Sequence, residues 1–506
     1  MTIALALLSG LLCAASFPKF GTPACAWIAL SPLIVAAALS ARPDRSILRH
    51  PFTLGLLAGL VYFGGTLYWL AGVMATYGDL SPWLSVLIAV LLASYLALYP
   101  AVFAVLVARA VRRFGAAGVW FAPCVWVATE WVRGSIGGGF PGVPLGASQA
   151  GVIPIVQLAS VTGVYGISAL VALVATGAAA VAISRRRVHW VGFGAVGALV
   201  AVVAGWGMLR VTTGRLVRTG TVLRVGLLQG NVEQDAKWNP AFRDAILRRY
   251  IDLSRQAIGA GAGVVIWPEA SMPFFFNTES AAAEPVRRLA AESRTPFVIG
   301  ADEAEPGVNG APGRIYNAAV LLGPDGRSRA TYRKMQLVPF GEYVPFKDLL
   351  FFVKHLVAQV SDFSPGTEPV VFDLGGQRLS VAICYESAYP WIARALVERG
   401  SELLATITND AWFDRSSAAY QHFEMGAIRA VEEGRFVVRA ANTGISGAVD
   451  PYGRVLAATR LFEPLAITVD VRLLDDRTVY SRVGDLVVWL SLGLTGLVLP
   501  GRPRNR

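Results

Sequence analysis

The chain has 506 residues, enough for two or three domains, and it is 54% hydrophobic and 16% charged with a formal net charge of +11. Soluble domains carry about 25% charged residues, so this composition argues against a wholly soluble chain and indicates membrane segments. Loop arginines explain the positive charge better than nucleic-acid binding, because neither an aromatic-interleaved basic motif nor zinc-finger spacing accompanies it.

Apolar stretches near the length of a bilayer-crossing helix, about 20 residues, fill the first part of the chain. The first stretch ends in small residues like a signal peptide, but it lacks a positively charged start, which favours a retained helix. Seven stretches before residue 212 and one after the polar region are predicted spans: 2–16, 22–41, 52–76, 82–108, 117–133, 152–183, 190–211 and 483–501.

Arginine placement predicts the orientation, because loops on the inner side of a membrane are rich in Arg and Lys. With the N-terminus inside, the outer loops hold little beyond Lys19 and Arg133. The predicted domains are therefore a helical membrane domain at 1–211, a polar domain on the outer face at 212–481, and a last helix with a basic inner tail at 482–506. The inner-side arginines are Arg42, Arg45, Arg49, Arg109, Arg112, Arg113, Arg185, Arg186, Arg187, Arg502, Arg504 and Arg506.

Two features near the predicted outer surface have more than one interpretation. Glu130 and Arg133, in the Gly-rich stretch 128–149, lie where unpaired charge is costly. They form either a structural ion pair as i, i+3 neighbours or a lipid headgroup site. The aromatic stretch 61–70 is explained equally well by interfacial belt residues and by a ligand groove.

From residue 222 onward, short β-branched runs alternate with helical stretches, which predicts a layered α/β domain. Functional side chains are expected where strands end. Expected strands are 222–231, 263–271, 296–303, 316–327, 378–387 and 401–410, and expected helices are 239–258, 285–293 and the stretch YPWIARALVERG.

Three residues at strand ends or in loops could form a site: Glu269 in WPEAS, Lys334 in YRKMQLVPFGEYVP and Cys384 in ICYES. A free thiol is mostly protonated at pH 7, so a nucleophilic Cys384 needs a base and a nearby cation. Glu269 could act as the base, and Lys334 could supply the cation. Each residue alone also has a structural explanation: a buried cysteine, a turn-capping glutamate and a solvated lysine.

In this order, the three motifs resemble the nitrilase superfamily, whose catalytic set is Glu-Lys-Cys and whose fold is an αββα sandwich. Seven spans before such a domain and one after it resemble one branch, the apolipoprotein N-acyltransferases of the bacterial inner membrane. QGNVEQDAKW (229–238), TNDAWFDRSSAAYQHF (408–423) and ANTGISGAVDPYGRV (441–455) are also similar to that family. The implied fold is a multi-pass α-helical membrane domain joined to an α/β nitrilase-like domain.

The resemblance implies a role for each matching residue. Glu269 corresponds to the general base, Lys334 to the oxyanion-side lysine and Cys384 to the nucleophile. One departure lies in the membrane half, where Gly142 occupies a position at which the family pattern suggests Trp. The implied supporting residues are Glu342, Tyr385, Glu386 and Trp238.

The implied reaction moves the sn-1 acyl chain of a phospholipid to the thiol and then to the α-amine of a diacylglyceryl-cysteine lipoprotein. We expect a monomer in the bacterial inner membrane, with its catalytic domain facing the periplasm, and no cofactor, metal or nucleic-acid partner. The carboxylate of Glu269, near an apolar surface, is expected to have a raised pKa. The apolar stretches 271–280 and 346–357 either dip into the lipid or pack in the core.

Two other functions fit parts of the pattern. A membrane-tethered amidase of small amides shares the three residues and differs only in using water as the acceptor. A transporter or lipid scaffold needs no reactive thiol, but few charges in the apolar segments could line an ion pathway.

Overall fold

The computed structural model describes residues 1–41, 46–78, 80–136, 138–307, 313–339, 341–343 and 362–499. The chain folds into two compact units. Unit 1 comprises Met1–Thr213, Ser416–Ile428 and Thr478–Arg506, and unit 2 comprises Gly214–Arg415 and Arg429–Arg477. Helix α16 (Ala418–Glu433) therefore contributes to both units.

Among the described residues, unit 2 contains two six-stranded sheets, each with a parallel centre and antiparallel edges. The first sheet has the order β12-β1-β2-β3-β4-β5, and the second has the order β11-β10-β9-β8-β7-β6. The first sheet consists of β1 (Thr221–Gln229), β2 (Val264–Ile266), β3 (Phe297–Glu305), β4 (Arg314–Leu322), β5 (Ser328–Arg333) and β12 (Leu465–Leu473). The second consists of β6 (Phe372–Asp373), β7 (Arg378–Ile383), β8 (Leu403–Thr408), β9 (Phe436–Ala441), β10 (Gly447–Val449) and β11 (Val455–Ala458).

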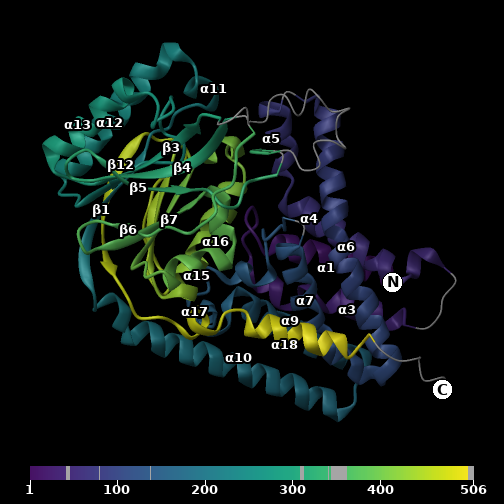
Figure 1. The fold of residues 1–506 in the computed structure, drawn as a ribbon. Helices are drawn as coiled ribbons and strands as arrows, with labels where there is room; N and C mark the ends of the chain where they lie inside the picture. The colour runs from purple at the N-terminus through teal and green to yellow at the C-terminus, as the bar shows by residue number, and fades with distance from the viewer. Residues whose placement is uncertain are drawn as a thin grey trace. The chain divides into compact units, whose positions relative to one another are not determined.

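The sheets pack face to face, with helices on their outer faces (Figure 1). Val225 and Ile266 of the first sheet share one buried core with Val381 and Ile407 of the second. Helices α12 (Arg243–Gly259) and α13 (Ser280–Ser293) cover the first sheet over a second core, and α15 (Pro390–Glu398) packs on β7. This is the αββα sandwich that the resemblance to the nitrilase superfamily implies, and it is a layered α/β domain as the strand and helix pattern predicts.

The expected strands and helices up to residue 410 appear close to their predicted places. The segment after 410 supplies strands that the sequence analysis did not assign, including β12, which pairs antiparallel with β1 along its whole length. Short strands such as β10 carry too few residues for a period-2 pattern to stand out.

Unit 1 contains an apolar helix or a broken helix at each of the eight predicted membrane stretches. Before residue 212 these are α1 (Thr2–Ala15), α2 (Ala26–Ala29) with α3 (Ser31–Leu39), α4 (Pro51–Thr66) with α5 (Trp69–Tyr77), α6 (Pro82–Phe114), α7 (Ala122–Ser135), α8 (Ile153–Val156) with α9 (Ala159–Ile183), and α10 (Arg187–Thr213). After the two-sheet unit, α17 (Val479–Val483) precedes α18 (Leu486–Gly496).

By length and apolar composition, three helical segments among the described residues can cross a membrane: Pro82–Ser135, Ala159–Ile183 and Arg187–Val217. A fourth is possible if α4 and α5, bent by 56° at their junction, form one span. The apolar helices Thr2–Ala15, Pro23–Leu39 and Leu486–Gly496 are shorter. Eight spans therefore stay a prediction, and Arg42, Arg45, Arg502, Arg504 and Arg506 lie outside the described residues.

Gly163 shows why one predicted span is broken near its start. Its φ of +68° interrupts the helical conformation, and a Cβ there would lie 2.5 Å from the Tyr480 ring. Only glycine combines this backbone conformation with so close an approach. The contact fixes the segment carrying α17 and α18 against α9.

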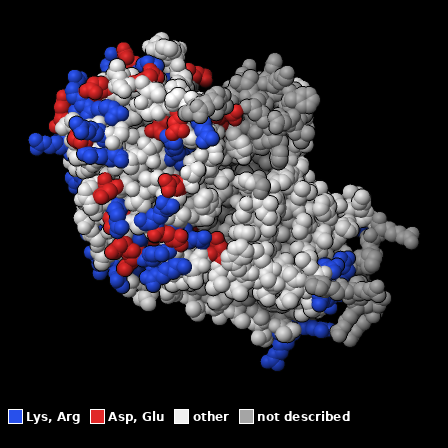
Figure 2. Space-filling view, viewed as in Figure 1, with Lys and Arg blue, Asp and Glu red and all other residues white. Residues whose placement is uncertain are grey.

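The two units differ in surface charge (Figure 2). In the face shown, Lys, Arg, Asp and Glu side chains cover the two-sheet unit, whereas the helical unit is almost wholly uncharged apart from basic side chains at one end. An uncharged exterior around apolar helices is suited to a hydrocarbon environment.

Candidate active site

The candidate site is built from side chains that follow three strands of unit 2. Glu269 lies just beyond β2 and Lys334 directly follows β5, both in the first sheet. Cys384 directly follows β7 in the second sheet. Strand ends place polar side chains at the edge of a buried core, where the backbone groups needed to bind them are also available.

Glu269, Lys334 and Glu342 form a buried cluster of charges. The Lys334 Nζ lies 3.2 Å from Glu269 Oε1 and 2.9 Å from Glu342 Oε1. Asn317 on β4 donates from Nδ2 to the same two carboxylates, at 2.7 and 2.8 Å. The backbone N–H of Asn409 donates to the other Glu269 oxygen at 2.8 Å. Such a dense set of partners is what buried charges require.

This cluster determines the resting protonation states of its members. Burial works to raise the pKa of Glu269, but the Lys334 ammonium and the Asn317 hydrogen bond bring the pKa below its ordinary value. Burial works to lower the pKa of Lys334, yet Glu269 and Glu342 raise it well above its ordinary value. The expectation of a raised Glu269 pKa is therefore wrong, because paired charge outweighs desolvation.

Cys384 is half-buried and has a φ of +54°, an unusual conformation for a residue with a Cβ. Its position between β7 and a short 3₁₀ turn, Cys384–Ala388, is a sharp strand-to-turn corner. Burial raises the pKa of the Cys384 thiol, Glu269 raises it further, and Lys334 opposes that rise. The resting group is a protonated thiol within electrostatic range of a carboxylate and an ammonium.

Glu386 connects the turn that carries Cys384 to the segment that carries Lys334. One of its oxygens accepts from the backbone N–H groups of Met335 and Gln336, and the other accepts from that of Ile383 at 2.7 Å. The Tyr332 hydroxyl donates to both oxygens. Although fully buried, the carboxyl keeps these partners, and burial raises the pKa of Glu386 to about 7.

The remaining predicted residues make the following contacts. Glu342 also accepts a hydrogen bond from the backbone N–H of Val338, at 2.8 Å. The Tyr385 ring meets Tyr389 edge-on with ring centroids 5.5 Å apart. The Trp238 side chain is 45% exposed and lies against Phe275, with ring centroids 5.7 Å apart.

Four buried residues near the cluster were not identified from the sequence: Asn317, Asn409, Lys237 and Asp302. Asp302 on β3 is paired in register with Asn317 on β4, and Asp302 Oδ1 and Asn317 Oδ1 are both buried without a hydrogen-bond partner. Burial raises the pKa of Asp302 to about 7 and lowers the pKa of Lys237. The available signal was a polar residue inside an apolar strand, as in YNAAV and IGADE.

The proposed lipid contact of 271–280 is not supported by its burial. Phe274 and Phe276 are at most 1% exposed and belong to the core between the first sheet and helices α12 and α13. Core packing, the alternative interpretation of this stretch, is therefore correct for Phe274 and Phe276. The second proposed lipid stretch, 346–357, lies outside the described residues.

Comparison with known proteins assigns both units. A carbon–nitrogen hydrolase family model matches residues 224–477, and an apolipoprotein N-acyltransferase N-terminal domain model matches residues 9–177. A nitrilase-superfamily amidase from Nesterenkonia has 24% identity, covers 51% of this chain and 93% of its own, and has a TM-score of 0.39.

Two curated relatives extend over nearly the full chain. The apolipoprotein N-acyltransferase of Geobacter metallireducens is 41% identical over 98% of this chain and 94% of its own length. That of Gloeobacter violaceus is 33% identical over 97% and 92%, respectively. The chain therefore belongs to the apolipoprotein N-acyltransferase family, membrane-bound enzymes whose catalytic unit has the carbon–nitrogen hydrolase fold.

Proposed function

We propose that the protein transfers the sn-1 acyl chain of a phospholipid, through a thioester at Cys384, to the N-terminal α-amine of diacylglyceryl-cysteine lipoproteins, which is the last step of lipoprotein maturation. The observation that carries this proposal is the buried Glu269–Lys334–Glu342 cluster beside a strained cysteine. It supplies a base, a fixed cation and a nucleophile without a cofactor.

In the first half-reaction, Cys384 Sγ attacks the ester carbonyl of the phospholipid while Glu269 takes the thiol proton. The developing oxyanion is stabilised by the Lys334 ammonium, which its two carboxylates keep protonated. When the tetrahedral intermediate collapses, the carbon–oxygen bond breaks, and Glu269 returns the proton to the departing lysophospholipid alkoxide. The enzyme is then a neutral thioester, with Glu269 ionised again.

In the second half-reaction, the neutral α-amine of the lipoprotein attacks the thioester carbonyl. Glu269 removes a proton from the attacking nitrogen and passes it to the departing Cys384 sulfur. This forms the amide bond, breaks the carbon–sulfur bond and regenerates the thiol. The lowered pKa of Glu269 makes it a carboxylate ready to accept a proton at neutral pH in both halves.

The supporting residues are assigned roles that follow from their contacts. Glu342 holds the Lys334 ammonium together with Glu269. Glu386 holds the Cys384 turn and the Lys334 segment in one geometry. Tyr385 directly follows Cys384, and Trp238 directly follows Lys237, which interacts electrostatically with Glu269 and Cys384. Of these, Trp238 is the most exposed and is suited to contact with an incoming substrate.

We assign the enzyme to the bacterial inner membrane as a multi-pass monomer with unit 2 on the periplasmic face. Arg109 and Arg113, near the end of α6, donate to the carbonyls of Val498, Leu499 and Leu497. These contacts support placing the end of α6 and the end of α18 on one side of the membrane, which is the basic, inner side in the predicted orientation.

The test is the intact mass of purified protein incubated with a phospholipid. We expect a mass gain equal to one fatty acyl group, absent in Cys384→Ala. Adding a diacylated lipopeptide should then remove the acyl group and yield an N-acylated peptide. Release of free fatty acid in place of that product would identify a hydrolase, and a wild-type protein that gains no mass would refute the thioester.

A further inference from the structure

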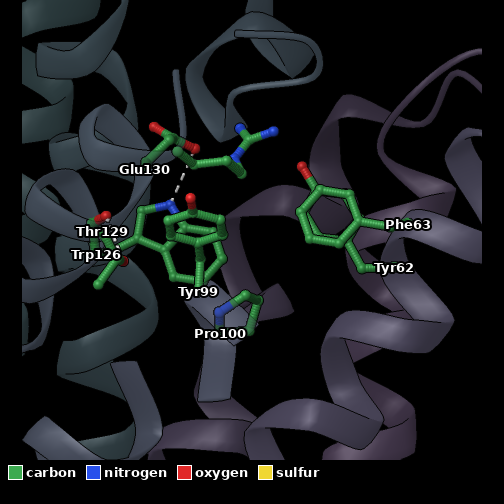
Figure 3. Close-up of a pocket in the computed structure, with 8 residues that line it drawn as sticks. Tyr62, Phe63, Tyr99, Pro100, Trp126, Thr129 and Glu130 are labelled. Atoms are coloured by element: carbon green, nitrogen blue, oxygen red, sulfur yellow. Dashed lines mark hydrogen bonds between the residues drawn. The ribbon is translucent and has the colours of Figure 1, made fainter. Parts of the chain in front are cut away.

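Buried charged side chains outside the charge cluster of the candidate site occur in both units. In unit 1, Figure 3 shows Glu130 on α7 beside Trp126, whose indole N–H donates to it at 3.2 Å. Glu130 also accepts from the backbone N–H of Leu145 at 2.7 Å, and Arg133 donates to the Gly142 carbonyl at 2.6 Å. These separate contacts take the place of the Glu130–Arg133 ion pair considered from the sequence, and they hold the 142–145 segment against α7.

In unit 2, the end of strand β8 brings a buried threonine beside Cys384. Strands β7 and β8 run parallel, and Ile383 pairs with Ile407, so the next residues along the two strands, Cys384 and Thr408, are neighbours. The Thr408 side chain is fully buried and forms a hydrogen bond with the Cys384 side chain. Neighbouring strands lie about 4.8 Å apart, so this contact follows from the register of the sheet.

Asp410 determines which way the Thr408 hydroxyl points. Thr408 Oγ1 donates to Asp410 Oδ1 at 2.9 Å, and Arg439 Nη2 donates to Asp410 Oδ2 at 2.8 Å. Gly444 permits this packing, because a Cβ there would lie 2.0 Å from Asp410 Oδ2. A carboxylate accepts hydrogen bonds and has no proton to donate. The single hydroxyl proton of Thr408 therefore points to Asp410, and the oxygen offers only lone pairs to Cys384.

This orientation suits a protonated thiol, whose S–H can donate to Thr408 Oγ1. It does not suit a thiolate, because the lone pairs of two acceptors would then face each other. Burial is the largest cause of the raised pKa of the Cys384 thiol; among the smaller causes, Asp410 adds to the rise and the Thr408 hydrogen bond opposes it. A hydroxyl favours a thiolate only by donating to it, so Thr408 must turn from Asp410 to the sulfur when the thiol ionises.

We propose that Thr408 is a further catalytic residue, whose hydroxyl accepts from the resting Cys384 thiol and rotates to donate to the sulfur as Glu269 takes the thiol proton. The thiol proton moves from Sγ to the Glu269 carboxylate. The O–H bond of Thr408 stays intact, and only its hydrogen bond moves, from Asp410 to Sγ. Asp410 keeps its Arg439 partner during this change, so no buried carboxylate is left unpaired.

This inference rests on the proposed function in that Cys384 is the nucleophile, but its test needs no lipid. Thr408→Val in the full-length protein replaces the hydroxyl with a methyl group of similar size. The rate of Cys384 alkylation by iodoacetamide at pH 8 would be followed by peptide mass, which separates Cys384 from the other three cysteines. The thiol is mostly protonated at this pH, so the rate reports the thiolate fraction. We expect it to fall about tenfold, the effect of losing one hydrogen bond to a charged group.

Two further variants separate the hydroxyl from the shape of the side chain. Thr408→Ser keeps the hydroxyl and should restore alkylation close to the wild-type rate. Thr406→Val makes the same change at another buried threonine of β8, and as the matched control it should leave the rate unchanged. If Thr408→Val does not fold, as judged by its thermal midpoint, Thr408→Ala also lacks the hydroxyl and decides in its place.

Two outcomes would overturn the inference: wild-type alkylation in a folded variant that lacks the Thr408 hydroxyl, or alkylation by Thr408→Ser as slow as that by Thr408→Val. Single-turnover acylation by phospholipid should fall in the same variants and recover with serine. A wild-type protein that gains no acyl group would refute the proposed function while leaving the alkylation difference intact, so the two failures are distinguishable.

Discussion

Buried charge serves different purposes in the two units. In unit 2, Lys334 lies between Glu269 and Glu342, and Asn317 and a backbone N–H complete the partners. In unit 1, Glu130 and Arg133 on α7 each bind the backbone of the 142–145 segment, through Leu145 and Gly142 respectively. The closed network of unit 2 fixes protonation states for chemistry, whereas the two charges of unit 1 hold a loop segment against a helix.

The largest effect is expected from removing the Lys334 ammonium from the network that it forms with Glu269 and Glu342. Lys334→Met would leave Glu269 and Glu342 as adjacent buried carboxylates, so one would take up a proton and the oxyanion would lose its cation. We expect the rate of Cys384 acylation to fall by at least about 10³-fold, measured by intact mass in a single turnover.

Lys334→Arg is the charge-conserving control for this experiment. It keeps the cation but not the compact ammonium geometry, so it should recover stability more than rate. Acylation by Lys334→Met at more than a tenth of the wild-type rate would contradict the assigned role of the ammonium.

The aromatic stretch 271–280 gives a second test, because its burial argues for packing and against lipid contact. Phe276→Ala should lower the free energy of unfolding of unit 2 by about 3–4 kcal/mol, since it empties a fully buried site. Phe275→Ala, at a half-buried ring beside Trp238, should cost much less. Equal and small losses of thermal midpoint in both variants would show that Phe276 is not a core residue.

Asp302 interacts electrostatically with the Glu269–Lys334–Glu342 network, so its titration can be followed through the pH dependence of stability. Its folded-state pKa of about 7 lies above the ordinary value of about 3.9, so its protonated form favours folding. That contribution is complete below about pH 4 and is lost as pH rises to about 7, amounting to at most about 4 kcal/mol. The charged groups acting on it are Lys237, Glu269, Glu342 and Lys334.

Asp302→Asn should therefore raise the thermal midpoint relative to wild type at pH 8 and lose that advantage as the pH is lowered toward 4. The amide stays neutral throughout, and it can donate to the unpartnered Asn317 oxygen. A midpoint difference between variant and wild type that stays constant from pH 4 to pH 8 would contradict the titration of Asp302.

The smallest expected effect lies at the end of unit 1. Arg113→Ala removes a 2.9 Å hydrogen bond to the Leu497 carbonyl just beyond α18, and it should cost about 0.5–1 kcal/mol. Faster hydrogen exchange of the α18 amides would report it. Arg112→Ala, at an exposed neighbour on the same turn, is the control, and similar exchange in both variants would argue against a specific cap.

The sequence by itself determined the features that depend on local pattern. Uncharged stretches of bilayer length marked the helical segments, and alternation of β-branched and helical runs marked the layers of unit 2, because hydrophobic burial imposes these periods on any chain. Glu269, Lys334 and Cys384 were identifiable because their three motifs together, in this order, resemble the nitrilase superfamily, although each residue alone also had a structural explanation.

Only the tertiary structure decided how those residues act on one another. Asn317 and Asp302 are remote in sequence from Glu269, and cross-strand pairing of β3 with β4 brings them to it. The lowered pKa of Glu269 required the distance to Lys334, and the burial of Phe276 required the cover of α12 and α13. Electrostatic and packing energies depend on separation in space, which a local sequence pattern does not contain.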